Sequence, residues 1–142
     1  MNIQLGTSTR DRITGSSGAD LLIGLGGNDT ISAGDGDDII IGHQLGASAR
    51  NEVDTLTGGR GADRFVLAGG YLGDGASGYA AITDFSLAQR DQLILARGLR
   101  YTFRQTATGT EVLAGSDLIA QLRGAFLGSG TVDSRTSWVG FI

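Results

Sequence analysis

The chain of 142 residues contains no cysteine and no lysine, and its only glutamates are Glu52 and Glu111. Without cysteine the fold has no disulfide framework. No apolar run is long enough to span a membrane as a helix. The first residues, Met1 to Gly6, lack the basic and apolar regions of a cleavable signal peptide, so we expect none. A chain of this length fits one domain or two small ones.

The acidic charge of the chain is concentrated in its first half. Residues 1–66 hold nine acidic residues and five arginines, whereas residues 67–142 hold six of each, so the net charge of −4 arises in the first half. A protein that binds nucleic acid presents a basic face, and no such face is indicated here. The imbalance instead favours a cation bound in the first half.

The first half also carries a repeat with a fixed period. Aspartates recur every nine residues, interrupted once by an insertion of seven residues around positions 42–50, and glycines crowd the positions before them. An apolar side chain follows each aspartate by two residues. The pairs are Asp11 and Ile13, Asp20 and Leu22, Asp29 and Ile31, Asp38 and Ile40, Asp54 and Leu56, and Asp63 and Phe65. A fixed short period of this kind predicts a coiled repeat architecture.

Each unit of the repeat divides into a Gly-rich loop of six residues and an apolar strand of three. The units are 6–14, 15–23, 24–32, 33–41, 49–57 and 58–66. Strands this short are stable only when they stack. A coil with two units per turn places strands that are 18 residues apart in parallel, about 4.8 Å from one another. We therefore expect an all-β parallel β-roll over residues 1–78, with Leu22 on Ile40 and Ile13 on Ile31.

The same stacking places carboxylates in two columns. One column holds Asp11, Asp29 and Asp54, and the other holds Asp20, Asp38 and Asp63. Two carboxylates at this spacing repel by roughly 1 kcal/mol in bulk water and by roughly 3–4 kcal/mol at a surface-like dielectric constant. A divalent cation between them reverses the sign. Calcium fits best because it accepts many oxygen ligands in irregular geometry, whereas magnesium requires a stricter geometry and zinc prefers His or Cys.

This repeat resembles the glycine-rich nonapeptide of repeats-in-toxin (RTX) proteins, the haemolysin-type calcium-binding family. The resemblance covers residues 6–66 and is clearest in Gly58-Gly59-Arg60-Gly61-Ala62-Asp63-Arg64-Phe65-Val66. It implies a right-handed parallel β-roll that binds about four Ca²⁺ ions, with one or two more at the ends. Each ion would lie between loops two repeats apart.

The resemblance also implies the ligands. One loop would offer the main-chain carbonyls of its second and fourth residues together with its Asp carboxylate, and the partner loop would offer its first and third carbonyls and its own Asp. The four implied sets are Ser16, Gly18, Asp20, Ala33, Asp35 and Asp38; Gly34, Gly36, Asp38, Gly58, Arg60 and Asp63; Thr7, Thr9, Asp11, Gly24, Gly26 and Asp29; and Leu25, Gly27, Asp29, Ala49, Asn51 and Asp54. The last set depends on how the insertion packs.

Residues 79–142 lose the period but keep a β-like pattern. Ile82-Thr83-Asp84-Phe85 and the segment from Asp91 to Leu95 are similar to the chain that follows the repeats in secreted family members such as serralysin-type proteases. By this resemblance Asp84 would close the last calcium loop, and Asp74 is a weaker candidate. Expected strands are 80–85, 92–96, 100–105, 110–114, 117–122 and 137–142, with a hairpin turn at Thr108-Gly109. We expect this segment to cap the open end of the roll.

Several functional alternatives remain at this stage. His43, the only histidine, is expected to be exposed in the insertion and has no Ser or Cys motif beside it, so we expect no enzyme activity. The arginines with Tyr101, Phe103 and Trp138 could line a surface for an acidic polysaccharide, as in the similar R modules of alginate epimerases. The loosely apolar end from Trp138 to Ile142 fits either a final strand or the type I secretion signal of the family. The favoured function is a secreted or cell-surface domain that folds on binding calcium.

Overall fold

The computed structural model describes residues 1–44, 51–73, 75–131 and 136–142, and these form an all-β fold. The strands are β1 (Asn2–Leu5), β2 (Arg12–Thr14), β3 (Asp20–Ile23), β4 (Thr30–Asp35), β5 (Ile39–Ile41), β6 (Val53–Arg60), β7 (Arg64–Val66), β8 (Tyr79–Ile82), β9 (Gln92–Leu95), β10 (Tyr101–Gln105), β11 (Gly109–Ala114), β12 (Asp117–Arg123), β13 (Gly130–Thr131) and β14 (Val139–Phe141), with one short 3₁₀ helix, η1 (Leu87–Gln89). Among these residues no helix is long and apolar enough to cross a bilayer.

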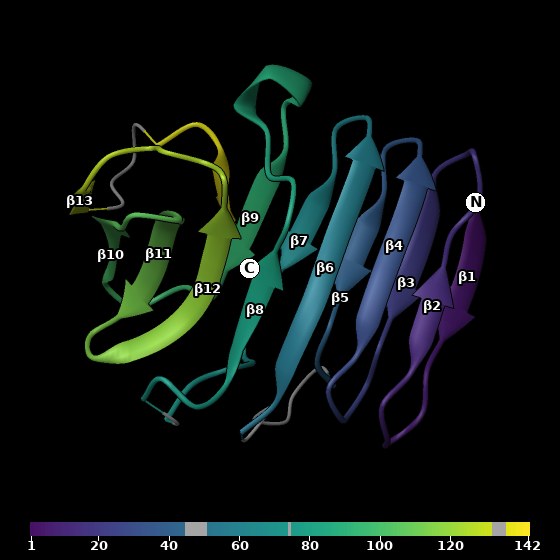
Figure 1. Cartoon of the computed structure of the whole chain (residues 1–142), viewed down its shortest axis with the longest axis horizontal. Coiled ribbons are helices and arrows are strands. Elements are labelled where there is room, and N and C mark those ends of the chain that lie inside the picture. Colours follow the sequence, from purple (N-terminus) through teal and green to yellow (C-terminus); the bar gives the residue numbers. More distant parts are fainter. Residues whose placement is uncertain (45–50, 74, 132–135) are drawn as a thin grey trace.

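The repeat half is a coil of parallel strands that alternate between two sheets. One sheet has the order β1-β3-β5-β7-β9-β14, and the other begins at its N-terminal edge with β2-β4-β6-β8. Figure 1 shows the coil advancing from the purple N-terminal strands toward the green β8 and β9. Every pairing among these strands is parallel. The predicted all-β architecture of stacked parallel strands is therefore confirmed.

The register between turns follows the nine-residue period. Leu22 pairs with Ile40, and Ile13 with Ile31, as the 18-residue turn predicts. Beyond the insertion Ile31 pairs with Leu56, so the seven extra residues leave the register of the coil unchanged. A slip of one residue would turn every apolar side chain outward, which is why the buried face fixes the register so firmly.

The apolar residue of each repeat lies in the core between the two sheets. Leu22, Ile40 and Phe65 line one side and are fully buried, and Ile31 and Leu56 do the same on the other. Burial of a side chain of this size stabilises a fold by roughly 1.5–3 kcal/mol. One continuous cluster runs from Ile13 in the first turn to Leu122 in β12 and Ala125 just beyond it.

Two repeat strands extend well beyond the three residues expected. β4 and β6 run through part of their loops, because Gly34 pairs with Gly59 and Asp35 with Arg60. The glycines allow this close approach: a β-carbon on Gly59 would lie 1.9 Å from the carbonyl oxygen of Gly34. Gly59 also has a φ of 99°, which side-chain-bearing residues rarely adopt.

The second half of the chain extends both sheets. β8 and β9 continue the parallel coil past residue 78, and β14 adds to β9 in parallel. β12 joins β8 in parallel and leads into the antiparallel β11, β10 and β13, which lie at the opposite end of the molecule from β1 and β2 (Figure 1). The predicted hairpin is present, and Thr106 donates its amide to the carbonyl of Gly109 at 2.8 Å.

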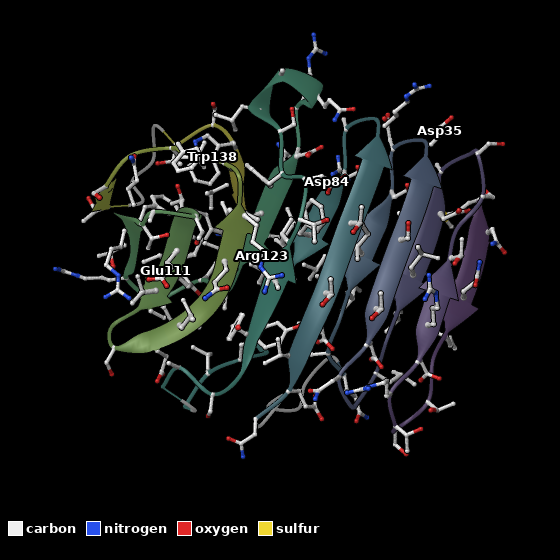
Figure 2. The ribbon with its side chains drawn as sticks, in the orientation of Figure 1. Asp35, Asp84, Glu111, Arg123 and Trp138 are labelled. Carbon is white, nitrogen blue, oxygen red and sulfur yellow. The ribbon has the colours of Figure 1, made fainter. Side chains whose placement is uncertain are left out.

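Aromatic rings fill the space between the sheets at this end. Phe65 lies 6.2 Å from Phe85, Phe85 lies 5.7 Å from Trp138, and Trp138 lies 4.7 Å from Phe103, measured between ring centroids. Figure 2 shows Trp138 on the side of the molecule that holds β10 to β13. The C-terminal segment thus carries apolar side chains that continue the core beyond the last repeat.

Candidate metal centre

The second column of aspartates is a continuous ladder of hydrogen bonds. The amide of Asp20 donates to Oδ1 of Asp38 at 2.8 Å, and the amide of Asp38 donates to Oδ1 of Asp63 at 3.0 Å. All three side chains are buried. Each carboxylate is therefore held with one oxygen fixed by the turn before it.

The first column repeats this arrangement on the other edge of the coil. The amide of Asp11 donates to Oδ1 of Asp29, and the amide of Asp29 donates to Oδ1 of Asp54, both at 2.8 Å. Asp54 is 25 residues beyond Asp29, so the insertion does not displace its aspartate from the column. Both predicted columns are thus formed as the 18-residue turn requires.

The second carboxylate oxygen is left without a partner in three loops. Oδ2 of Asp29, Asp38 and Asp63 is buried and accepts no hydrogen bond from the described residues. Burial raises the pKa of Asp63 to about 7 and that of Asp29 to about 6, with neighbouring carboxylates adding to both shifts. Burial likewise raises the pKa of Asp38. An unpaired buried acceptor costs roughly 1–3 kcal/mol, and more when it is charged.

In the first two loops, by contrast, the Oδ2 oxygen of the repeat aspartate accepts hydrogen bonds from its own loop. Thr7 donates its amide at 2.5 Å and its hydroxyl at 2.9 Å to Oδ2 of Asp11. Ser16 donates its amide to Oδ2 of Asp20 at 2.5 Å, and this bond, ahead of the others, lowers the pKa of Asp20. Hydroxyl residues thus stand in these loops where later repeats have Leu25, Gly34 or Gly59.

Main-chain carbonyls lie beside these carboxylates. A β-carbon on Gly15 would meet the carbonyl oxygen of Ala33 at 2.0 Å and Oδ2 of Asp20 at 2.7 Å. A β-carbon on Gly6 would meet the carbonyl of Gly24 at 2.3 Å and Oδ2 of Asp11 at 2.7 Å. The first-position carbonyl of one loop therefore lies close to the carboxylate of the loop two repeats earlier, as the implied ligand sets require.

The second- and fourth-position carbonyls face the next turn in the same way. The carbonyls of Ser16 and Gly36 would lie within 2.3 Å of β-carbons on Gly34 and Gly61. The third-position residues Gly26 and Arg60 contact the neighbouring turn through the main chain. Gly26 donates its amide to the carbonyl of Thr7 at 3.0 Å, and the carbonyl of Arg60 accepts the amide of Gly36 at 2.7 Å. The remaining implied residues, Thr9, Gly18, Asp35 and Gly58, lie in these same loops.

The chemistry of this donor set fits a hard divalent cation. The groups that gather between turns are carboxylate and carbonyl oxygens, which are the ligands that calcium takes. Within the described ranges no three carboxylate or imidazole side chains converge on one point, so a cation needs the main-chain carbonyls as well. The glycines provide the space, because a side chain at Gly24 would meet Oδ2 of Asp29 at 2.3 Å.

The insertion changes the fourth implied set. Gly42, and not a residue after the insertion, takes the first position of its loop, because Gly24 donates to the carbonyl of Ile41 and lies beneath the carbonyl of Gly42. Ala49 lies outside the described residues. Asn51 has a left-handed φ of 55° at the point where the loop rejoins the coil. Glu52 accepts the amide of Gly27 at 3.0 Å and brings one more carboxylate to this site.

Asp84 lies against the last repeat loop. Its carboxylate accepts the amides of Gly58 at 2.9 Å and Gly59 at 2.7 Å. Figure 2 shows it at the end of β8, on the same edge of the sheet as Asp35 at the end of β4. The carboxylate of Asp84 is thus hydrogen-bonded to main-chain amides of the loop that precedes Asp63. Asp74 lies outside the described residues.

Asp91 extends the second column and was not identified from sequence. Its Oδ1 accepts the amide of Asp63 at 3.0 Å, and its Oδ2 accepts the amide of Ser86 at 2.8 Å. Burial raises the pKa of this carboxyl. The signal was the apolar strand directly after Asp91, the same arrangement that follows each repeat aspartate, although here η1 replaces the glycines.

One expectation about a side chain outside the repeat was wrong. His43 is fully buried, because Gly42 and His43 still belong to the coil and Gly70 leaves room for the ring. Its Nε2 lies 3.2 Å from the carbonyl oxygen of Ala68, and burial lowers its pKa. Tyr101 and Phe103, which the sequence offered as an alternative lining for a polysaccharide surface, are buried in the core.

Comparison with known proteins supports the assignment of the repeats. No curated protein matches the chain. The family model of the RTX calcium-binding nonapeptide repeat (4 copies) matches residues 5–43 and 51–71, and the break between the two segments coincides with the insertion. With the aspartate ladder and the stacked parallel strands, this match shows that residues 5–43 and 51–71 are RTX calcium-binding nonapeptide repeats.

Proposed function

We propose that this chain is a non-enzymatic calcium-binding domain whose repeat half folds when calcium occupies the spaces between turns. The observation that carries the proposal is the set of buried, unpaired Oδ2 atoms on Asp29, Asp38 and Asp63. Three such carboxylates in a domain of this size favour unfolding. A folded domain is stable by only about 5–15 kcal/mol, so the free-energy cost of burying these unpaired carboxylate oxygens is large enough to prevent folding.

The ligand residues are those of the two columns. Asp38 would serve two sites, one with Asp20 and one with Asp63, because its two neighbours lie in the turns on either side. Asp29 holds the same place between Asp11 and Asp54. When bound, a calcium ion supplies the positive charge that the paired carboxylates lack. If calcium exceeds each dissociation constant about tenfold, each site adds about 1.4 kcal/mol, and four sites add about 6 kcal/mol.

Coupling between calcium and folding suits a protein that is exported unfolded. At low calcium the carboxylates repel one another, and the Gly-rich loops are costly to order. We propose that the chain leaves the cell by a type I secretion route and folds outside, where calcium is abundant. Support comes from the match to the repeat family and from the excess of acidic residues in the first half of the chain.

A count of bound ions tests the proposal. Native mass spectrometry of the whole chain, dialysed against calcium and then against a chelator, should show about four calcium ions that are lost on chelation. Binding should protect the chain from proteolysis. A chain that retains no calcium above the level of an unrelated acidic protein contradicts the proposal.

A further inference from the structure

The first aspartate column ends in a hydrogen bond from a tyrosine. The hydroxyl of Tyr71 donates to Oδ2 of Asp54 at 2.5 Å, and both side chains have no exposed surface. In the preceding turn of this column, Oδ2 of Asp29 has no donor among the described residues. The two carboxylates occupy equivalent positions in the coil, so Tyr71 accounts for the difference.

The hydroxyl stands where the turn before has a main-chain carbonyl oxygen. A β-carbon on Gly24 would meet Oδ2 of Asp29 at 2.3 Å and the carbonyl of Gly42, in the next turn, at 2.5 Å. A β-carbon on Gly42 would meet Oδ2 of Asp54 and the hydroxyl of Tyr71, both at 2.5 Å. The tyrosine oxygen thus takes the place of the next turn's carbonyl and directs a proton, not a lone pair, at the carboxylate.

The surrounding residues hold this hydroxyl in place. The ring of His43 packs edge-on against Tyr71 at 5.2 Å between centroids, and Gly70 leaves the room that His43 needs. Tyr71 has a left-handed φ of 59°, which is rare for an aromatic residue and is tolerated only where the surroundings enforce it. In β8 the residue aligned with Asp54 is Ala80, so no carboxylate follows in this column.

We propose that Tyr71 takes the place of a calcium ion at the end of the first column, so that Asp54 is satisfied on this side by a hydroxyl and the column closes without a cation. This inference rests on the proposed calcium binding of the preceding turns. The two columns end differently: in the first, Oδ2 of Asp54 accepts a side-chain hydroxyl, whereas in the second, Oδ2 of Asp91 accepts the amide of Ser86 and Oδ2 of Asp63, one turn earlier, is unpaired. Tyr71 is a positioning residue: it satisfies the outer carboxylate oxygen of Asp54 and contributes no ligand to any ion.

The test compares Tyr71→Phe with Tyr101→Phe in saturating calcium. Tyr101 is a matched control, because it is also buried but donates to a neutral carbonyl, that of Ala96, at 3.2 Å. Tyr71→Phe should bind as many calcium ions as the wild type by native mass spectrometry. Its melting temperature should fall by roughly 5 °C or more, because a hydrogen bond to a charged group is lost and calcium does not replace it. The melting temperature of Tyr101→Phe should fall by less than that of Tyr71→Phe.

Two results would overturn the proposal. One is a melting temperature of Tyr71→Phe equal to that of the wild type in saturating calcium. The other is a loss of one bound ion in Tyr71→Phe, which would make the hydroxyl part of a calcium site. Asp38→Asn separates this test from the proposed function. If Asp38→Asn leaves the calcium affinity unchanged, the proposed function fails, whereas the role of Tyr71 is still decided by the melting temperatures.

Discussion

The amide of Asp38 donates to Oδ1 of Asp63 at 3.0 Å, although the two residues are 25 positions apart and the repeat requires 18. The seven-residue insertion therefore leaves both the register and the column intact. It also leaves Oδ2 of Asp63 buried without a donor among the described residues. Oδ2 of Asp38 is unpaired as well, so both carboxylates in this pair combine a fixed position with an unmet charge, and this combination governs how the domain responds to calcium and to pH.

Asp38→Asn should weaken calcium binding more than any other single change, because Asp38 lies between two predicted sites. A tenfold loss at each site corresponds to roughly 3 kcal/mol of stability in saturating calcium. In chelator the variant should hold at least as much β structure as the wild type, because an unpaired buried charge has been removed. Asp35→Asn is the control, since its exposed side chain lies in the same loop and its carbonyl is retained. Equal losses of calcium affinity in the two variants would contradict the assigned register.

Acid should partly replace calcium. The pKa values of Asp29, about 6, and Asp63, about 7, are raised above the usual value of 3.8 by burial. The folded form therefore binds protons that the unfolded form releases. This proton binding stabilises the folded form at acidic pH, and the stabilisation is lost as the pH rises through about 6 to 7. His43 opposes the effect below pH 6.5, the usual pKa of a histidine, because burial lowers its pKa in the folded form.

In chelator we expect circular dichroism to show more β structure at about pH 5 than at about pH 8, since several carboxyls outweigh one imidazole. In saturating calcium the trend should reverse, because protons compete with the ion for the carboxylates. A chelated chain that loses β structure steadily as the pH is lowered from about 8 would refute this account of the columns.

Gly59→Ala should disrupt the roll without touching any carboxylate. The new β-carbon would lie 1.9 Å from the carbonyl of Gly34, at a φ of 99°. We expect a loss of at least about 2–3 kcal/mol, measured by urea unfolding in calcium. Gly18→Ala is the matched control, because no atom lies within 4 Å of the added carbon, and its stability should change by less than about 0.5 kcal/mol. Similar losses in the two variants would show that the turns are not packed this closely.

The columns and the stacked strands could be predicted from sequence because one period fixes both. A strand whose partner lies 18 residues away needs no long-range information, and Ile13, Leu22, Ile31 and Ile40 pair as that distance requires. The insertion was harder to place. A glycine at position 42 and a repeat restarting at residue 49 satisfy the same spacing, and the contacts of Gly24 with the carbonyls of Ile41 and Gly42 distinguish them.

The residues that close the coil could not be found in this way. Tyr71 contacts Asp54, and His43 contacts Ala68, although neither Tyr71 nor His43 holds a position of the repeat motif. Asp91 follows Asp63 by 28 residues, with a 3₁₀ turn in place of the glycine loop, so the period no longer marks it. Periodicity identifies residues that recur, whereas the residues that end the repeat occur once.

Circular dichroism of the whole chain during a calcium titration, at about pH 8 and starting from excess chelator, tests the central claim most directly. The account predicts little β signal in chelator and its cooperative appearance as calcium is added, with magnesium much less effective at equal concentration. A full β spectrum in excess chelator, unchanged by calcium, would contradict the claim that occupied calcium sites hold the roll together.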